Sequence, residues 1–277
     1  MEIIVPTENK VLDAAWTNPV MATLRQGKPV IGITLTVGSA EIAAQAAEMG
    51  FDFLWIEMEH SPVTLESLRD MVLATRGLKA VPFARVPVNQ IWMAKRVLDC
   101  GVLGVMFPFT STPELARQAV AACKYPPVGK RGSGAGLATF SWPAQEGYYD
   151  FADRNVMVTI IIEEASAVEG IEQIASTPGV DVIFVGTSDL SFSLGCRGQQ
   201  DHPKVQEALK RIANAAKANH KILGAPATDA EQMKAMIERG FLFFQTATET
   251  GLMARGARQV LDPFGKTAVE PKTNALY

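Results

Sequence analysis

One unit recurs along this chain: a helical pattern ends at a glycine, and an apolar run rich in β-branched and aromatic residues follows at once. The glycines of these units are Gly50, Gly101, Gly179 and Gly240. A glycine just past a helix supplies the left-handed position that ends the helix, and the chain then enters a strand. The unit therefore predicts strands that alternate with helices, which is typical of a parallel sheet with right-handed crossovers.

Eight apolar runs have the length and composition of buried strands, and helical patterns separate nearly all of them. The predicted strands are 30–36, 53–56, 80–85, 102–107, 156–162, 182–185, 221–225 and 242–246. Eight such units in roughly 250 residues is the size of an α/β (β/α)8 barrel, the TIM-barrel fold. The alternative is an open doubly wound sheet, which we disfavour because no glycine-rich phosphate turn follows the first strand.

The domain organisation and the class of protein follow from composition. We predict a single barrel domain over residues 1–277, with an N-terminal extension at 1–17 and a C-terminal tail at about 262–277. The chain is 48% hydrophobic with a net charge of −3, and it has no basic stripe that would indicate nucleic acid. No apolar run reaches the roughly 18 residues of a membrane span, and the first residues lack a secretory signal pattern.

The three cysteines are Cys100, Cys123 and Cys196, and none forms a Cys-x-x-Cys pair. This spacing indicates neither a zinc site nor redox chemistry. We therefore expect a reduced, cytoplasmic protein that binds neither nucleic acid nor membranes.

Ionisable residues follow the predicted strand at 53–56 directly, as Glu57, Glu59 and His60. Burying an unpaired carboxylate costs several kcal/mol, so these residues either line a solvated loop or form a site. Three further strands end in a similar way, with Arg85, with Glu163-Glu164 and with Thr187-Ser188-Asp189. The carboxyl ends of barrel strands share one mouth, where barrel enzymes place their catalytic residues, so the repetition favours a site.

Glu163 and Asp189 end neighbouring strands and are candidate ligands of one divalent cation. Carboxylates without accompanying Cys or His favour a hard metal such as Mg²⁺ or Mn²⁺. Two protein ligands leave positions for water and for the oxygens of a 2-keto acid. The alternatives are that Asp189 caps a short helical turn and that Glu163 is a solvated loop carboxylate.

His60 is the one histidine of three that the predicted elements place at a strand's carboxyl end, because His202 precedes a helix and His220 precedes a strand. A nearby carboxylate, Glu57, is suited to fix the tautomer of His60 and make it a base. Arg85 is suited to bind an enolate or keto oxygen, and its alternative role is a structural salt bridge. No lysine lies at a predicted strand's carboxyl end, which argues against a Schiff base.

The longest connection runs from about Tyr125 to Asn155 and contains the glycine-rich run 130–136. Its glycine spacing matches neither dinucleotide nor phosphate fingerprints, and no strand leads into it. We expect a mobile loop over a barrel mouth.

These residues resemble those of the class II, metal-dependent 2-keto-3-deoxy acid aldolases, the HpcH/HpaI family, from about Asn18 to Leu261. The motifs that carry the resemblance are Trp55-Ile56-Glu57-Met58-Glu59-His60, Phe83-Ala84-Arg85, Lys124-Tyr125-Pro126-Pro127-Val128-Gly129-Lys130-Arg131-Gly132, Ile162-Glu163-Glu164-Ala165 and Val185-Gly186-Thr187-Ser188-Asp189-Leu190-Ser191. The resemblance implies a barrel of the phosphoenolpyruvate/pyruvate type that assembles as a hexamer, a trimer of dimers, by exchanging a C-terminal helix.

The resemblance also implies the roles of site residues. Glu163 and Asp189 would hold Mg²⁺, Mn²⁺ or Co²⁺, and His60 would be a base assisted by Glu57. Arg85 would stabilise a pyruvate enolate. Asp99 matches a residue that reaches the site of a neighbouring subunit, although the sequence by itself would make it a helix-end acid. Ser188, Thr34 and Ile161 would join Arg85 at the substrate.

The chain departs from the family pattern at three positions. The family usually has aspartate at the position of Glu57, and well-studied members have tryptophan at Thr34 and glutamine at Ile161. The last two positions lie near the substrate, so the departures bear on which substrate is used. A diacid such as 4-hydroxy-2-oxoheptanedioate is therefore only a default.

The predicted function is a metal-dependent aldolase that cleaves a 4-hydroxy-2-keto acid to pyruvate and an aldehyde. The first alternative is an oxaloacetate decarboxylase or a synthase that forms a carbon–carbon bond through the same enolate. The second is a lyase of CoA esters, and the third is a binding protein without catalysis. The acid, base and metal residues present together favour an enzyme.

Overall fold

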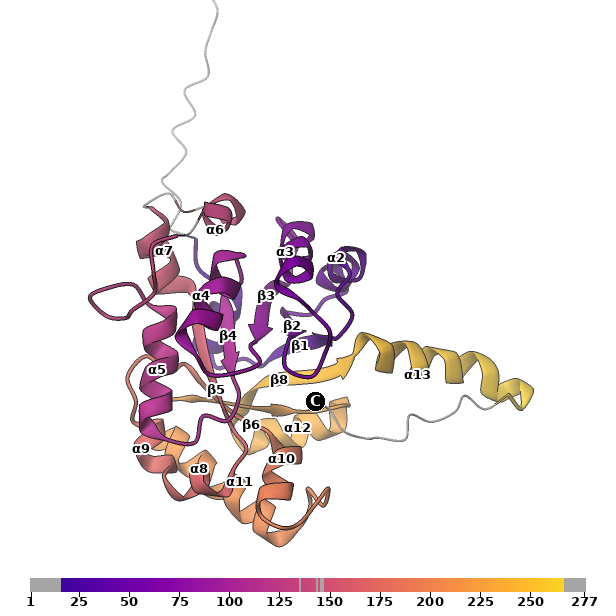
Figure 1. The fold of residues 1–277 in the computed structure, drawn as a ribbon. Coiled ribbons are helices and arrows are strands. Elements are labelled where there is room, and N and C mark those ends of the chain that lie inside the picture. The colour runs from indigo at the N-terminus through magenta and orange to yellow at the C-terminus, as the bar shows by residue number, and fades with distance from the viewer. Residues whose placement is uncertain (1–15, 135, 143, 145–146, 267–277) are drawn as a thin grey trace, which may run out of the picture.

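The fold is a closed barrel of eight parallel strands paired in sequence order, with β8 returning to β1 (Figure 1). The structure, a computed structural model, describes residues 16–134, 136–142, 144 and 147–266. The strands are β1 (Val30–Leu35), β2 (Phe53–Glu57), β3 (Val81–Arg85), β4 (Gly104–Phe107), β5 (Met157–Ile162), β6 (Val182–Val185), β7 (Ile222–Pro226) and β8 (Phe241–Thr248). All eight predicted strands are thus confirmed, and closure excludes the open doubly wound sheet.

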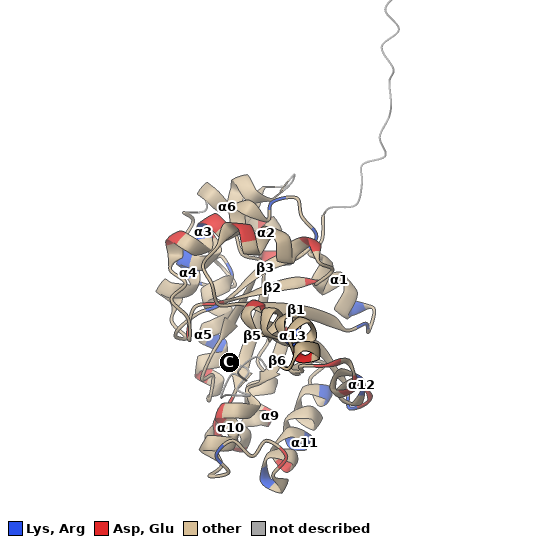
Figure 2. Cartoon of the chain, turned by 90° about the vertical axis from the view of Figure 1, so that its right-hand side faces the viewer, with Lys and Arg blue, Asp and Glu red and all other residues tan. Residues whose placement is uncertain are grey.

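Helices follow every strand and form the outer layer of the barrel (Figure 1). They are α1 (Pro19–Arg25), α2 (Ala40–Glu48), α3 (Leu65–Ala74), α4 (Ile91–Asp99), α5 (Pro113–Cys123), α6 (Gly136–Ser141), α7 (Tyr148–Asn155), α8 (Ala165–Glu169), α9 (Ile171–Ala175), α10 (Thr187–Ser193), α11 (Pro203–Ala218), α12 (Ala230–Glu238) and α13 (Glu249–Leu261), with a 3-10 turn η1 (Asp262–Phe264). None of the described helices is long and apolar enough to cross a membrane. Figure 2 shows acidic and basic residues interspersed over these outer helices.

The glycines that end the helices adopt the conformation that the sequence predicts. The backbone φ angles are 110° at Gly50, 105° at Gly101, 85° at Gly179 and 91° at Gly240. These positive values are strained for any residue with a Cβ atom. Each glycine therefore turns the chain from a helix into the next strand, which fixes the repeating unit of the barrel.

Aromatic side chains fill the part of the barrel interior that lies away from the carboxyl ends of the strands. The rings of Phe53 and Phe243 stack with centroids 4.4 Å apart, and those of Trp55 and Phe184 lie 4.9 Å apart. Gly32 makes room for this layer, because a Cβ atom there would lie 2.2 Å from the Phe53 ring. Side chains alternate along a strand, so the interior residues of β2 are Phe53, Trp55 and then Glu57. Interior side chains thus change from apolar to charged towards the carboxyl end.

The described residues of the segment at 125–155 do not lie over the mouth, so that prediction is wrong. They include α6 and α7, and contacts of Lys124 and Trp142 hold the segment where the strands begin. The Trp142 indole N–H donates to the carbonyl of Gly101 at 2.7 Å, just before β4. Lys124 Nζ donates to the carbonyl of Val156 at 2.9 Å, just before β5. The segment follows α5, which runs away from the mouth, and connection length alone does not report that direction.

Two observations describe the ends of the described chain. Trp16 belongs to the predicted N-terminal extension, yet its ring lies 5.3 Å from Trp142 and 5.5 Å from Phe151, so the barrel includes it. At the other end, α13 projects away from the barrel (yellow in Figure 1), and none of its residues is buried. Met253 and Val260 of this helix are 70% and 65% exposed. The first 15 residues and the tail from 267 lie outside the described residues.

Candidate active site

The site is built around an ion pair between neighbouring strands. Glu57 at the end of β2 is in register with Arg85 at the end of β3. Both side chains face the barrel interior, where they are 0% and 4% exposed, and Arg85 Nε donates to Glu57 Oε2 at 2.6 Å. A buried charge is stable only with a partner of opposite sign, and the register supplies that partner directly.

Glu57 accepts three further hydrogen bonds. The indole N–H of Trp55 donates to Oε2 at 3.1 Å. The backbone N–H groups of Glu59 and His60 donate to Oε1 at 2.8 and 3.0 Å. The carboxylate of Glu57 therefore contacts both the barrel interior and the turn that follows β2.

Arg85 is held on two sides and retains a free donor. Its Nη1 lies 3.3 Å from Glu59 Oε2, and its guanidinium carbon lies 5.8 Å from the centre of the Trp55 ring. Among the described residues, no group accepts a hydrogen bond from the buried Nη2 atom. A buried donor without an acceptor costs about 1–3 kcal/mol. This cost is recovered when a ligand oxygen binds, so Arg85 is suited to hold an anionic or carbonyl oxygen.

Glu163 follows β5 and is 2% exposed. Its Oε1 accepts the backbone N–H of Phe109 at 2.6 Å. Gly186 leaves room for the carboxylate, because a Cβ atom there would lie 2.8 Å from Glu163 Oε2. Burial raises the pKa of Glu163 to about 8, opposed by the Phe109 N–H and increased by the nearby charges of Glu59 and Asp189.

Phe109 has an unusual backbone conformation. Its φ angle is 46°, in the left-handed region that non-glycine residues rarely adopt. This conformation accompanies the N–H donation to Glu163, while the residue stays 44% exposed. The strain of the residue thus lies at a candidate metal ligand.

Glu59 joins the same acidic group. Burial raises the pKa of Glu59 to about 7, Arg85 opposes the rise, and the charges of Glu57 and Asp189 add to it. Glu59 Oε2 accepts no hydrogen bond from any described residue. Carboxylates that repel one another in a buried site are suited to a divalent cation, which would relieve both the repulsion and the cost of burial.

The donor set fits a hard metal with few protein ligands. Glu163 and Asp189 offer carboxylate oxygens, and the charge of Asp189 raises the pKa values of both Glu59 and Glu163. Within the described residues, no group of three or more His, Cys, Asp or Glu side chains is arranged around a single metal position. Two carboxylates supplemented by water and substrate oxygens are the kind of set that Mg²⁺ and Mn²⁺ accept.

His60 lies at the rim of this group. Its side chain is 43% exposed, and its Nε2 atom lies 3.7 Å from Glu59 Oε1. The other two histidines are elsewhere: His202 caps the start of α11, and His220 precedes β7. The imidazole of His60 is therefore the one that a substrate in the mouth can reach.

The other three predicted substrate residues lie on or after three different strands, β1, β5 and β6. Thr34 of β1 is buried, donates to the carbonyl of Thr246 at 3.2 Å and accepts from Gln245 Nε2 at 3.0 Å. Ile161 of β5 is buried, two residues before Glu163. Ser188 is half-buried next to Asp189 in the first turn of α10.

Asp99 is not brought to this group within one chain. It is the last residue of α4, which begins after β3 and ends before β4, so it lies at the end of the barrel opposite the mouth. Arg131 Nη2 donates to Asp99 Oδ1 at 3.1 Å and to the Tyr148 hydroxyl at 3.3 Å. Burial raises the pKa of Asp99, and the Arg131 bond opposes the rise.

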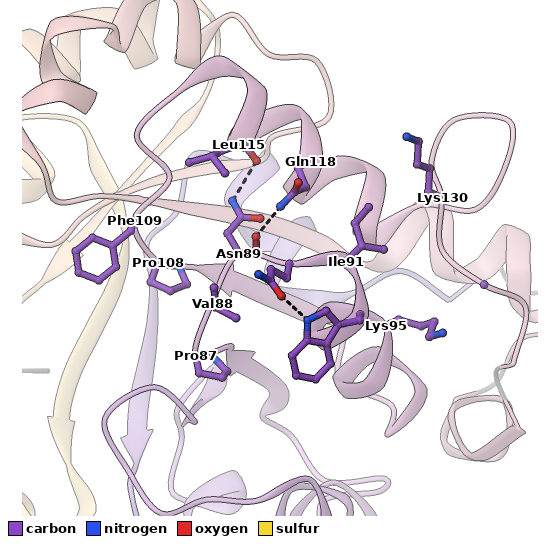
Figure 3. Close-up of a pocket in the computed structure, with 13 residues that line it drawn as sticks. Pro87, Val88, Asn89, Ile91, Lys95, Pro108, Phe109, Leu115, Gln118 and Lys130 are labelled. Carbon is purple, nitrogen blue, oxygen red and sulfur yellow. Dashed lines mark hydrogen bonds between the residues drawn. The ribbon is translucent and has the colours of Figure 1, made fainter.

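A hollow of about 850 Å³ lies beside the mouth, between the start of α4 and α5 (Figure 3). Its lining residues are Pro87, Val88, Asn89, Gln90, Ile91, Trp92, Lys95, Pro108, Phe109, Leu115, Gln118, Lys130 and Gly132. None of the predicted catalytic or metal residues is among these lining residues. We therefore place the chemistry at the strand ends, where the buried charges are, and not in this hollow.

Two residues of the site are not predicted by the sequence. In the sequence Trp55 is one more apolar strand residue. Only the structure shows that its indole N–H faces the barrel interior and donates to Glu57. Phe109 follows Pro108 after a strand, which predicts a turn but not a backbone N–H aimed at Glu163. The sequence marks Glu59 as a strand-end acid without indicating its role.

A parallel barrel whose strand ends carry paired carboxylates, a buried arginine and an accessible imidazole is the architecture of a barrel enzyme. The HpcH/HpaI aldolase/citrate lyase family model matches residues 31–256. The chain belongs to this family, and it is an enzyme of the carbon–carbon lyase class.

Individual relatives agree with this assignment. A hydroxypyruvate/pyruvate aldolase of Paraburkholderia phytofirmans is 34% identical over 254 residues, which cover 90% of this chain and 98% of that protein. A 5-keto-4-deoxy-D-glucarate aldolase of Shigella sonnei is 35% identical over 217 residues, covering 78% and 85%. The crystal structure of a family protein from Burkholderia cenocepacia is similar with a TM-score of 0.82 at 32% identity, covering 90% and 100%.

Proposed function

We propose that the protein is a class II aldolase that cleaves a 4-hydroxy-2-keto acid to pyruvate and an aldehyde. The observation that carries the proposal is the buried Arg85, whose Nη2 lacks an acceptor among the described residues beside the acidic group of Glu59 and Glu163. A donor fixed in a water-poor site stabilises negative charge that develops on a substrate oxygen. The 2-oxygen of a keto acid gains such charge when the C3–C4 bond breaks.

Glu163 and Asp189 would hold a divalent cation, Mg²⁺, Mn²⁺ or Co²⁺. When bound, the cation supplies Lewis-acid polarisation of a carbonyl oxygen. The chain's own contribution is to keep Glu163 in place through the Phe109 N–H and the space left by Gly186.

His60 would transfer the proton, and Arg85 would bind the oxygen that gains negative charge. His60 would take the proton of the C4 hydroxyl; the C3–C4 bond then breaks, and its electron pair moves onto C3 and the C2 oxygen. Arg85 Nη2 would hold that oxygen while the aldehyde leaves, and C3 then takes a proton to give pyruvate. The exposed rim position of His60 suits proton exchange with solvent, and the burial of Arg85 suits a fixed charge.

Lysine chemistry has no support in the described residues. Lys124 Nζ donates to the carbonyls of Asp153 and Val156, and Lys221 Nζ donates to those of Thr177 and Val180. Both lysines lie where strands begin, at the end opposite the acidic group. This arrangement supports a mechanism without a Schiff base.

The two named relatives suggest which keto acids to try first. One is named for hydroxypyruvate and pyruvate, the other for 5-keto-4-deoxy-D-glucarate. Thr34, smaller than the tryptophan of well-studied members, would enlarge the aldehyde side of the site. We therefore propose hydroxylated aldehydes of two to four carbons as partners of pyruvate.

We further propose a cytoplasmic homo-oligomer, a hexamer built as a trimer of dimers. The exposed apolar residues of α13 and the distance of Asp99 from its own mouth support assembly in which a neighbour receives both. The three cysteines are free, which suits a reducing compartment.

A pyruvate-release screen over 4-hydroxy-2-keto acids tests the function. We expect release with Mg²⁺ or Mn²⁺ and none after EDTA. Glu163→Gln should lose release and also weaken Mn²⁺ binding measured by electron paramagnetic resonance. Full activity in EDTA, or pyruvate trapped on the chain by borohydride, would overturn the proposal.

A further inference from the structure

The carboxylate of Glu57 is fully buried and accepts four hydrogen bonds, from Trp55, Arg85 and the backbone of Glu59 and His60. A carboxylate offers about four acceptor positions. Glu57 is therefore saturated by donors that belong to the protein itself. A group in this condition is suited to hold other groups in place and poorly suited to exchange a proton during a reaction.

The four donors divide between the two oxygens. Oε2 accepts from Arg85 Nε and the Trp55 indole, which belong to the barrel interior. Oε1 accepts from the backbone N–H groups of Glu59 and His60, which form the turn at the rim. One side chain thus connects the group proposed to hold the enolate with the segment that carries the proposed base.

We propose that Glu57 is a positioning residue that orients Arg85 and the 57–60 turn together, with Trp55 as its second fixed donor, and that it does not act as the acid–base partner of the His60 imidazole. The inference rests on the proposed function for the roles of Arg85 and His60. It assigns a different role to Glu57 from the dyad that the family resemblance implies.

Glutamate at this position has a geometric consequence. Its side chain is one methylene, about 1.5 Å, longer than aspartate. Glu57 uses that length to reach Arg85 and Trp55 on one oxygen while the other meets the turn. Aspartate from the same backbone is shorter by this length, so we expect Glu57→Asp to lose one set of donors and retain charge.

Three variants separate positioning from acid–base partnership: Glu57→Gln, Glu57→Asp and Trp55→Phe. Trp55→Phe removes one N–H and keeps a ring. Its matched control is Trp92→Phe on α4, which removes an indole N–H that donates to Gln90, outside the site. Hydrogen–deuterium exchange of the peptide covering 57–61, in the absence of metal, reports the turn directly. Binding of oxalate, an enolate analogue, with Mn²⁺ reports Arg85.

We expect exchange at 57–61 to rise about tenfold or more in Glu57→Gln and several-fold in Trp55→Phe, because hydrogen bonds to a charged group are strong. Oxalate affinity should fall in the same order, and Trp92→Phe should change neither. The pH at which kcat falls on the acid side should stay where it is in the unmodified enzyme.

The opposite pattern overturns the inference. A dyad predicts that Glu57→Gln shifts the acid limb of the kcat profile while exchange and oxalate binding stay unchanged. Exchange needs no turnover, so a protein that releases no pyruvate still tests the positioning role. If Glu57→Gln fails to fold, Trp55→Phe gives the same comparison, and unchanged exchange in it would count against the proposal.

Discussion

Two arginines are buried in the described part of the chain, Arg85 and Arg131, at opposite ends of the barrel. Each lies near aromatic rings: Arg85 is 5.8 Å from the ring of Trp55, and Arg131 is 4.8 Å from that of Tyr125. Among the described residues, Arg85 has one nitrogen atom without a hydrogen-bond acceptor, and Arg131 has two. They differ in their carboxylates, because Arg85 meets two acids and Arg131 meets one.

The difference distinguishes a group of crowded acids from a single ion pair. Arg85 belongs to a group in which two acids have strongly raised pKa values, so negative charge is crowded and a further cation is favoured there. Arg131 holds Asp99, which is 26% exposed in its side chain, and the hydroxyl of Tyr148. Burial of an arginine therefore does not by itself indicate a reaction site; the acids around it must also be considered.

The largest effect should come from Arg85 itself. Arg85→Lys keeps a charge but loses the planar guanidinium, and Arg85→Met loses both. We expect kcat to fall about 10²–10³-fold in Arg85→Met, the usual cost of removing a fixed oxyanion donor. Arg131→Met assayed in parallel should lower kcat much less per folded molecule. Equal losses in the two variants would remove the distinction drawn between the arginines.

Replacing Arg131 should lower the free energy of unfolding more clearly than it lowers kcat. Removing one partner of a buried pair costs about 3–5 kcal/mol, and Asp99 is partly exposed, so we expect about 1–3 kcal/mol for Arg131→Met. Urea unfolding measures this loss. The double variant with Asp99→Asn should recover part of it, because the stranded charge is gone. Additive losses would show that the two side chains do not interact.

The raised pKa values predict a pH dependence of stability. Between the ordinary carboxyl value of 4.5 and about 8, the folded state keeps a proton on Glu163 that the unfolded state releases. The folded state then binds more protons, so the free energy of unfolding of the metal-free protein should fall as pH rises through this window, with Glu59 adding to the fall up to about 7.

Thermal unfolding at a series of pH values, with and without Mn²⁺, measures this effect. Metal should restore more stability at pH 8 than at pH 5, because protons compete for the same carboxylates. In Glu163→Gln the pH-dependent fall should shrink. A metal-free protein that gains stability between pH 5 and 8 would contradict the assignment of a crowded acidic group.

The smallest effect should come from the backbone at Phe109. Asparagine and glycine tolerate a φ of 46°, while valine does not. Phe109→Asn and Phe109→Gly should keep Mn²⁺ affinity within about threefold, whereas Phe109→Val should weaken it by about tenfold. Affinity that follows side-chain hydrophobicity instead would show that the ring, and not the directed N–H, supports Glu163.

The sequence predicts the barrel well because its signals are local. Glycines such as Gly50 and Gly101 end helices through their own backbone freedom, and apolar runs of strand length follow them. The strand-end acids Glu163 and Asp189 follow from the same logic, since the carboxyl ends of all strands meet at one face. These inferences need only chain order and residue type.

The features that the sequence does not predict depend on which residues the fold brings close together. Trp55 becomes a hydrogen-bond donor to Glu57 only because both face the interior of a closed barrel. The prediction for the 125–155 segment is wrong because connection length does not report at which end of the barrel a segment packs. Asp99 is indicated by family resemblance alone, and no local pattern distinguishes it from an ordinary helix-end acid.

The helix α13 has a kinetic consequence. None of its 13 residues is fully buried, although Leu252 near its start packs partly against the barrel core. With a second copy as the partner proposed above, the last step of folding is bimolecular, and its half-time shortens as chains become more concentrated. Such a protein matures slowly when dilute and quickly when abundant, so the rate at which it is made sets how soon it reaches its final form.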